Sequence, residues 1–541
     1  METILNKLKK FKLKSPEEVF KVFGEWFDSN KKTAFIMALV IGFITHAVLL
    51  SVIIMTPDGL WNSIVYSAGL VETESGRWGI NIIDSLRKNL AFPSITTVFS
   101  IIITAVNAIF IVDLLNLKSK ISSVVTGTFL AVSPCLTMTL LYPYTADIYC
   151  FAFLFATLAA WCTYRENKKI VGGIFGAIFT MFTLSLYQGY LGAIVGMCVL
   201  KPIVDVLKGE KKYKQIFINI GISILVVIVG IGLYWGAEQI ALNVYNTKLS
   251  DYRGANEVGI LNSIKNIKGS IKSIYIAFWE FFFGGNIVNN GNMSRHTFYK
   301  ILFIAEAIAL VWVLIFRKTE DIKQKIIDAA LVIVMVLILP VALNCVCIIA
   351  PNTLFYPLNT AHLILIIPFM MAILENFEIS KGAILKWISL SMCLIIAVTY
   401  FLTANATYMG IRMKYNQAYS MTLRMVDRIE NCEGYDAYKP WMIVGIIDEK
   451  NTRPVSEIYF LTLGGVSNGP IFHGNYIGSI ETWKRFLQTF LGIQPIFASA
   501  EVYYKVCGTQ EFRDMPIFPE PGSVREINDV MVVKLTNDVP M

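Results

Sequence analysis

Apolar runs long enough to cross a membrane recur along most of this chain. A helix needs about 20 apolar residues to span the hydrocarbon core of a bilayer. The pattern therefore predicts a membrane all-α protein, a polytopic helical bundle over residues 33–404. Its spans number about eleven, near residues 33–55, 94–115, 121–141, 145–163, 168–186, 188–207, 215–242, 299–316, 326–349, 355–375 and 384–404.

The polar segments at the two ends of the chain follow other patterns. Residues 1–32 are basic, and residues 16–28 within them have the pattern of an amphipathic helix that anchors at the membrane surface. Residues 405–541 mix turn residues with short amphipathic stretches, which predicts a small α+β domain. Its expected elements are helices near 416–431 and 481–491 and strands near 441–447, 502–506 and 530–535.

The distribution of lysine and arginine predicts the orientation of the bundle. The N-terminal segment holds eight lysines, and the loops on the same side of an alternating topology are also basic. The short loops on the other side, near 142–146, 187–189 and 350–356, hold no basic residue. Positive residues mark the cytoplasmic face. We therefore expect a multi-pass protein of the bacterial plasma membrane, with a cytoplasmic N-terminus and an extracytoplasmic C-terminal domain. Loops 56–93 and 243–298 then face outward.

The composition supports a membrane protein and excludes several other classes. Of the 541 residues, 55% are hydrophobic and 16% are charged, whereas roughly a quarter are charged in an ordinary soluble protein. The net charge of +8 follows the topological pattern and does not indicate nucleic-acid binding. A nucleotide-type phosphate loop is absent from the sequence, which argues against ATP-driven transport.

The sequence predicts no cofactor. The four histidines are too scattered for a zinc site, so no metal ligands are expected, although a need for a divalent ion stays open. Most of the nine cysteines lie in or beside apolar runs, where a thiol behaves as a small hydrophobe. Cys432 and Cys507 lie in the polar tail, either free or paired with each other.

Asp58 is the leading candidate for catalysis. It follows the first predicted span directly, so its carboxylate would lie at the membrane surface and could act as a base on a lipid-anchored substrate. A structural interpretation is also open, because Pro-Asp-Gly commonly forms turns. The polar and aromatic residues of the same loop favour the functional interpretation.

That loop carries residues suited to a sugar phosphate. Arg77 has a planar fork that pairs with phosphate, unless it is an ordinary surface arginine. Trp61 and Trp78 either stack on a sugar ring or anchor the chain at the interface, which is the commoner role of tryptophan. Arg253, in the basic loop 243–298, is a second candidate for phosphate.

Four further candidates lie at the outer ends of later spans. Asp147 is a second outward carboxylate, which either positions a sugar or the first acid, or simply favours a helix N-terminus. Tyr144 precedes it in the same motif. Tyr187 and Gln188 form the tip of a tight hairpin between two spans, where polar groups either bind sugar hydroxyls or serve the turn.

Several short motifs occur here in the order and topology of a known family. They are residues 58–59, 75–79, 142–147 and 185–190, and near the end of the chain residues 515–519, 522–524 and 532–535. Together they resemble the bacterial type II glucosyltransferase family, whose known members modify O-antigen. The resemblance implies a GT-C type glycosyltransferase that works on the outer face. Such enzymes take a sugar, here glucose, from a polyprenyl-phosphate carrier and pass it to a cell-surface glycan.

The resemblance also implies residue roles. An aspartate of the first external loop is the general base in this family, and it corresponds to Asp58. Family members often carry paired acids there, whereas Gly59 follows Asp58 here, so Asp147 is the first choice for a second acid. Arg77, with Arg253, would hold the leaving phosphate. A single displacement without a covalent intermediate implies inversion at the anomeric carbon.

Two other classes of protein stay open from the sequence. A lipid-linked oligosaccharide flippase also has many spans, but the odd number of spans, the folded tail and the lack of inverted repeats argue against it. An O-antigen polymerase or ligase acts on the same kind of substrate, with its chemistry in a large later loop. The basic loop 243–298 keeps that class open.

Overall fold

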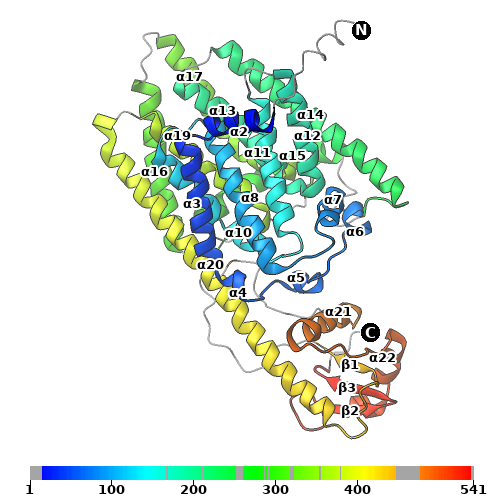
Figure 1. Ribbon diagram of the computed structural model, residues 1–541. Helices are drawn as coiled ribbons and strands as arrows, with labels where there is room; N and C mark the ends of the chain where they lie inside the picture. The colour runs from blue at the N-terminus through cyan, green and yellow to red at the C-terminus, as the bar shows by residue number, and fades with distance from the viewer. Residues whose placement is uncertain are drawn as a thin grey trace.

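The computed structural model describes residues 15–165, 169–209, 212–250, 260–285, 287–288, 293–316, 322–351, 355–377, 379–445, 463 and 476–537. It confirms the predicted fold class, because a helical bundle carries a small sheet-containing domain near the C-terminus (Figure 1).

Nine helical segments in the described part of the chain are long and apolar enough to cross a membrane. Each coincides with one of the predicted spans, which makes this a multi-pass membrane protein. The helices that form these segments are α8 (Pro93–Leu114), α9 with α10 (Lys120–Ala131 and Pro134–Thr139), α11 (Ala146–Thr163), α12 (Lys169–Leu186), α13 (Leu191–Lys208), α14 (Tyr213–Val244), α16 (Met293–Phe316), α17 (Ile322–Leu343) and α20 (Ile379–Glu430).

The other two predicted spans differ from a single long helix. Residues 33–55 form α3 (Ser29–His46) and one short turn, α4 (Val48–Ser51), before the chain extends toward Thr56. Residues 355–375 form two 3-10 turns, η5 (Pro357–Asn359) and η6 (Ala361–Leu365), and then α19 (Ile366–Glu375). The prediction of one long helix over residues 355–375 is therefore wrong in its first half. That half forms 3-10 turns, which are common in short connecting segments.

One end of the bundle carries helix α2 (Pro16–Trp26) and, among the described residues, Lys31, Lys118 and Lys208, which contact neighbouring segments there. Asp113 is central to this end. Its carboxylate pairs with Lys31 at 2.9 Å and accepts hydrogen bonds from the indoles of Trp26 and Trp161 at 3.2 and 2.6 Å. Helix α2 is exposed along most of its length and displays large apolar side chains, as expected for an interfacial helix.

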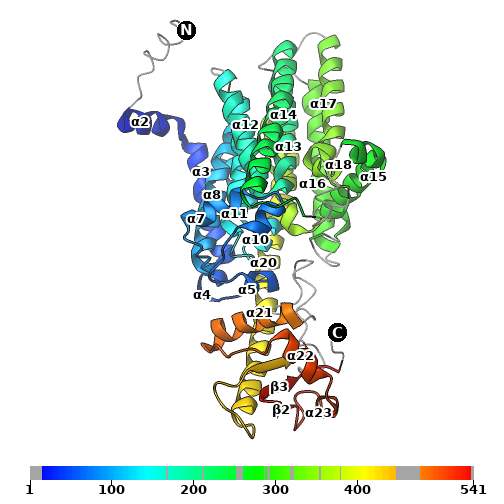
Figure 2. The ribbon, with the colours of Figure 1, turned by 90° about the vertical axis from the view of Figure 1, so that its right-hand side faces the viewer.

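The opposite end, called the Asp58 end below, carries three short helices, α5 (Pro57–Trp61), α6 (Leu70–Glu74) and α7 (Gly79–Leu86). Helix α20 leaves the bundle at this end and continues into the C-terminal domain, so α2 and that domain lie at opposite ends of the molecule (Figures 1 and 2). The domain boundary expected at residue 404 falls inside this unbroken helix of 52 residues.

The C-terminal domain is a three-stranded sheet with short helices. Strand β3 (Val530–Lys534) is central, parallel to β1 (Trp441–Val444) and antiparallel to β2 (Val524–Ile527). Helix α21 (Tyr476–Phe486) continues into a π-helical turn, η8 (Leu487–Leu491). The remaining helices are α22 (Ala500–Cys507) and α23 (Gln510–Arg513) of this domain, and α15 (Ile260–Trp279), α18 (Val346–Ile349), η2 (Gln188–Tyr190) and the π-helical η4 (Glu280–Gly284) of the bundle.

The predicted strand at 502–506 is wrong, because these residues lie in helix α22. Ser499 caps the helix by accepting a hydrogen bond from the N–H of Val502 at 3.3 Å. Tyr503 and Val506, three residues apart, are buried on one face, which is helical and not strand spacing. Cys432 and Cys507 are free thiols.

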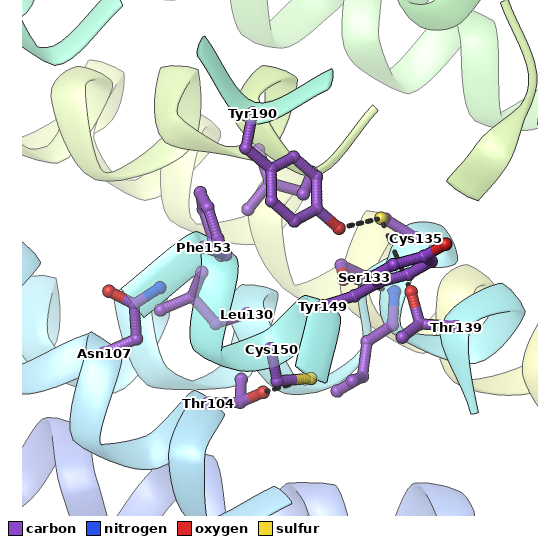
Figure 3. A pocket seen from close by; sticks show the side chains of 13 residues that line it. Thr104, Asn107, Leu130, Ser133, Cys135, Thr139, Tyr149, Cys150, Phe153 and Tyr190 are labelled. Carbon is purple, nitrogen blue, oxygen red and sulfur yellow. Dashed lines mark hydrogen bonds between the residues drawn. The ribbon is translucent and has the colours of Figure 1, made fainter. Parts of the chain in front are cut away.

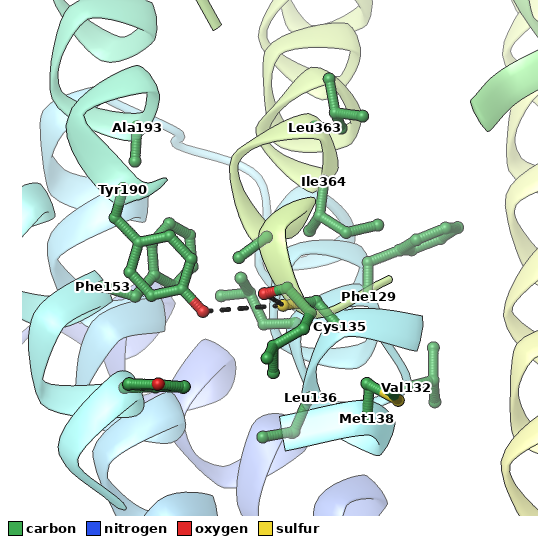
Figure 4. Packing of buried hydrophobic residues seen from close by; sticks show 14 of the residues in the cluster. Phe129, Val132, Cys135, Leu136, Met138, Phe153, Tyr190, Ala193, Leu363 and Ile364 are labelled. Carbon is green, nitrogen blue, oxygen red and sulfur yellow. Dashed lines mark hydrogen bonds between the residues drawn. The ribbon is translucent and has the colours of Figure 1, made fainter. Parts of the chain in front are cut away.

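The hydrophobic core runs without interruption from the bundle into the C-terminal domain. Trp441, Trp483 and Phe486 of the domain belong to the same buried cluster as the bundle residues. Figure 4 shows part of this cluster in the bundle, where Tyr190 and Phe153 pack near Cys135. The two parts therefore pack as one body at the Asp58 end.

Candidate active site

Asp58 lies in the first turn of α5, at the point where the chain leaves the bundle. Thr56 caps this helix by accepting a hydrogen bond from the N–H of Gly59 at 3.1 Å. The N–H of Thr56 also donates to the carbonyl of Leu141 at 3.0 Å, which fixes α5 to the turn before α11. The Asp58 side chain is exposed, and none of the described residues donates a hydrogen bond to its carboxylate. It is therefore free to accept a proton from a substrate.

Gly59 explains why this chain has no paired acids after the first span. A Cβ atom at this position would lie 2.8 Å from the carbonyl oxygen of Leu141 and 2.9 Å from the Cβ atom of Met55. Such distances do not occur between real side chains, and backbone cannot move away easily. A second carboxylate at residue 59 thus has no room in this fold.

Arg77 lies between α6 and α7 with a guanidinium that has no acidic partner in the described part of the chain. Its Nη1 donates a long hydrogen bond of 3.4 Å to the hydroxyl of Tyr149, and the group lies 5.5 Å from the ring centre of Tyr187. Its Nε is buried without a hydrogen bond. The side chain as a whole is half-buried, and a guanidinium without an acidic partner at such a place suits an anionic ligand such as a phosphate.

Gln188 holds the Arg77 loop in place. Its Nε2 donates to the carbonyls of Ser75 and Gly76 at 3.0 and 2.9 Å. Gly76 has a φ of +74°, and a Cβ atom there would lie 2.5 Å from the hydroxyl of Tyr234. The amide nitrogen of Gln188 is thus committed to the backbone, which makes this residue a positioning group for Arg77.

Tyr144 connects the two charged candidates. Burial raises the pKa of its hydroxyl well above the ordinary value, the charge of Asp58 adds to the rise, and the charge of Arg77 opposes it. The contacts of the two candidates place them beside the segment that carries Tyr144, because α5 is fixed to Leu141 and Arg77 donates to Tyr149. The Tyr144 ring packs edge-on against Tyr66, with centroids 4.8 Å apart, and the ring of Tyr149 lies 4.5 Å from that of Tyr187 in a tilted arrangement. The site is lined by tyrosines.

Asp147 is buried in an ion pair that the sequence did not reveal. Its carboxylate accepts from Nη1 of Arg87 at 2.7 Å, and Nη2 of Arg87 donates to Asp84 and to the carbonyl of Tyr144, each at 2.8 Å. One arginine thus joins α7 to the start of α11. Arg87 was missed because its partner lies 60 residues away, although its place three residues after Asp84 is a recognisable i, i+3 pair.

The two tryptophans and the second arginine complete the predicted set. Trp61 ends α5 and is 40% exposed at the Asp58 end. Trp78 precedes α7 and is half-buried, with an indole Nε1 that makes no hydrogen bond to the described residues. Arg253 lies outside the residues that the structure describes.

A small cavity lies inside the bundle next to Tyr149 (Figure 3). It measures about 30 Å³, enough for about two water molecules but not for a sugar. Thr104, Asn107 and Ser133 contribute polar groups to it. Both amide atoms of Asn107 are buried without a hydrogen bond. Water therefore fits this cavity, and a sugar must bind elsewhere. Over the described ranges no three His, Cys, Asp or Glu side chains are grouped as metal ligands.

The bundle and the polar site at one of its ends define the class of this protein, a multi-pass membrane protein with an enzyme-like site. A protein-family model described as Glucosyl transferase GtrII matches residues 62–375, more than half of the chain. The chain belongs to this family and is a membrane glycosyltransferase, which confirms the resemblance seen in its motifs. No curated protein and no solved structure matches it. Arg77, Asp147 and Gln188 lie within the matched region, and Asp58 lies just before it.

Proposed function

We propose that this glycosyltransferase moves glucose from a polyprenyl-phosphate carrier to a cell-surface glycan, on the outer face of the bacterial plasma membrane. The observation that carries the proposal is that Asp58 and Arg77 both lie beside residues 141–149, Asp58 through the bond that fixes α5 to Leu141 and Arg77 through its bond to Tyr149. An exposed carboxylate and a guanidinium without an acidic partner among the described residues thus lie at the same end of a membrane bundle. A base and an anion-binding group are what transfer from a lipid-linked sugar phosphate requires. Membership of a glucosyltransferase family supports glucose as the sugar.

The proposed chemistry is a single displacement. Asp58 takes the proton of an acceptor hydroxyl, and the oxygen attacks the anomeric carbon. The bond between that carbon and the phosphate oxygen breaks, and its electron pair leaves with the polyprenyl phosphate. The acceptor approaches from the side opposite the leaving group, so the anomeric configuration inverts.

Arg77 would stabilise the leaving group. The donor phosphate carries one negative charge as a diester and gains a second as the monoester departs. A guanidinium at this position therefore interacts more strongly with the transition state than with the donor, which is the condition for lowering a barrier. Arg253 would assist from the loop 243–298.

The other candidates take supporting roles in this proposal. Asp147 is paired with Arg87, so we assign it the task of positioning Tyr144 and α7 and leave the proton transfer to Asp58. Gln188 positions Arg77. Trp61 and Trp78 offer aromatic faces to sugar or lipid. Tyr187 is buried, and its ring lies beside the Arg77 guanidinium, so we assign it to positioning Arg77.

The first test compares wild type with Asp58→Asn in nanodiscs that contain synthetic polyprenyl-phosphate glucose and a cell-derived glycan. A general base contributes roughly 10²- to 10⁴-fold to a rate, so we expect transfer to fall at least 100-fold. The matched control is Glu433→Gln, which removes an exposed acid of the C-terminal domain and should transfer at the wild-type rate. Equal transfer by the Asp58 variant would exclude this residue as the base.

The configuration of the product tests the displacement itself. A synthetic donor of known anomeric configuration should give a glycoside of the opposite configuration, as read by NMR coupling constants. Retention would require a covalent intermediate and would overturn the proposed mechanism. Movement of the intact donor lipid between leaflets without any transfer would instead support the flippase that the sequence left open.

A further inference from the structure

Tyr415 is a buried residue of α20 that contacts the chain just before Asp58. Its hydroxyl donates a hydrogen bond of 3.1 Å to the carbonyl of Met55, and its side chain is 4% exposed. Met55 lies three residues before Asp58, in the extended stretch between α4 and α5. Helix α20 thus holds the segment that carries the proposed base.

The outer domain packs against the other side of Tyr415. The rings of Phe486 and Phe490 lie 6.3 and 5.2 Å from the Tyr415 ring. Helix α21, which ends at Phe486, also contacts α5 directly, and Figure 2 shows it just beyond α5 at the Asp58 end. The outer domain and the base-carrying segment therefore meet at Tyr415.

We propose that Tyr415 is a positioning residue for the reaction, through which the outer domain sets the place of the Asp58 carboxylate. The inference rests on the proposed function, because it takes Asp58 to be the base. It gives the outer domain a direct part in catalysis, in addition to any contact with the acceptor.

The local backbone explains why one hydrogen bond has this effect. Residues 53–55 are extended and make no helical hydrogen bonds of their own, so neighbouring groups hold them. The carbonyl of Leu141 accepts from Thr56, and Tyr415 donates to Met55. Gly59 packs closely against Met55 and Leu141. A shift of Met55 therefore displaces α5 and the Asp58 side chain that it carries. Misplacing a catalytic group by 1 Å can cost roughly 100-fold in rate.

The test uses Tyr415→Phe, which keeps the ring and its stacking but removes the hydrogen bond. We expect kcat to fall about tenfold, within the range that small misplacements produce, while KM for polyprenyl-phosphate glucose stays unchanged. The matched control is Tyr400→Phe in the same helix. It removes a buried 2.7 Å hydrogen bond to Tyr299, away from the Asp58 segment, and should leave kcat unchanged with a similar loss of thermal stability.

Hydrogen–deuterium exchange gives a second readout. The amides of Thr56 and Leu60 are hydrogen-bonded to Leu141 and Thr56, and they should exchange faster in the Tyr415 variant but not in the Tyr400 variant. A second variant, Phe490→Leu, loosens the stacking and should lower kcat in the same direction. It also covers the case in which Tyr415→Phe does not fold.

The outcomes separate this inference from the proposed function. Wild-type kcat and wild-type exchange in the Tyr415 variant would overturn the inference, even if Asp58→Asn is inactive. Full activity of Asp58→Asn would overturn the role of Asp58 and, with it, the basis for Tyr415. A fall in kcat that the Tyr400 variant shares would make Tyr415 a structural residue only.

Discussion

Two arginines ten residues apart in the same loop have opposite surroundings. Arg87 is enclosed by two carboxylates, Asp84 and Asp147. Arg77 contacts the hydroxyl of Tyr149 and the ring of Tyr187, and no carboxylate among the described residues pairs with it. The fold itself supplies the carboxylates that pair with Arg87, whereas we propose that a ligand supplies the anion for the half-buried Arg77. This difference supports Arg77 as the residue that binds the anion in the proposed reaction.

Replacing each arginine by glutamine should separate these two roles. Arg77→Gln should transfer sugar roughly 10²- to 10³-fold more slowly, as when a stabiliser of transition-state charge is removed, with thermal stability retained. Arg87→Gln should instead lose about 3–5 kcal/mol of stability, because two buried carboxylates lose their partner. Activity and melting temperature in nanodiscs report both effects. Slow transfer by an Arg87 variant of wild-type stability would contradict the assignment of a structural role to Arg87 and a catalytic role to Arg77.

At the scale of elements, two glycines allow the segments of the Asp58 end to pack closely against the rest of the bundle. Gly59 seats α5 on the turn at Leu141, and Gly76 lets the Arg77 loop meet Tyr234. A larger residue at either position displaces the candidate site as a unit. Gly59 and Gly76 thus determine where Asp58 and Arg77 lie, although neither glycine has a side chain that could take part in the reaction.

Gly59→Asp tests this element directly. The change restores the paired acids often found in the family, yet its Cβ atom would lie 2.8 Å from a backbone oxygen. We therefore expect lower activity, by at least tenfold as for a misplaced catalytic group, and a lower melting temperature. Gly69→Asp is the matched control, because nothing lies within 4 Å of a Cβ atom there. Increased activity of the Gly59 variant would show that the paired acids fit after all.

At the scale of the whole molecule, the bundle and the outer domain share one buried core. The sheet divides its side chains between two sides. Trp441, Met531 and Val533 join the core of the bundle, while Met442 and Val532 face the domain's own helices. Alternate residues of a strand point to opposite faces, so the sheet joins the two cores. We expect the outer domain to unfold together with the bundle.

Cys507 provides a way to measure this. Burial raises the pKa of its thiol to about 11, and the thiolate is the reactive form. Alkylation near pH 8 should therefore be about 100-fold slower in the folded domain than after unfolding, where the pKa is near 9. The stabilisation of the neutral thiol is complete below about pH 9 and is lost as the pH rises through 11.

Heating at pH 8 with iodoacetamide, followed by mass spectrometry of Cys507, gives the unfolding temperature of the domain. It should coincide with the loss of helical circular dichroism from the bundle. Alkylation at a clearly lower temperature would show that the domain unfolds alone.

The sequence was sufficient for the parts of this molecule that depend on local pattern. Apolar length predicted the spans, and the place of Asp58 after the first span made it a candidate. The rest depends on residues far apart in the chain. Gln188 forms a hydrogen bond with a loop that lies 112 residues away in the sequence, and Arg87 pairs with an acid 60 residues away. No local sequence pattern predicts either contact. The helix at 502–506 was missed because valine and tyrosine favour strands, while burial on the sheet decided the structure.

Because α20 runs without a break from the bundle into the outer domain, the number of residues in this helix sets the rotation of the domain relative to the bundle. Each residue in an α-helix turns the chain by about 100° and advances it by 1.5 Å. A single residue inserted between Tyr415 and Glu430 would rotate the sheet by more than a quarter turn relative to the bundle and pull it away from α5. Insertions and deletions in this stretch should therefore be rare among relatives, or come in multiples that complete whole turns.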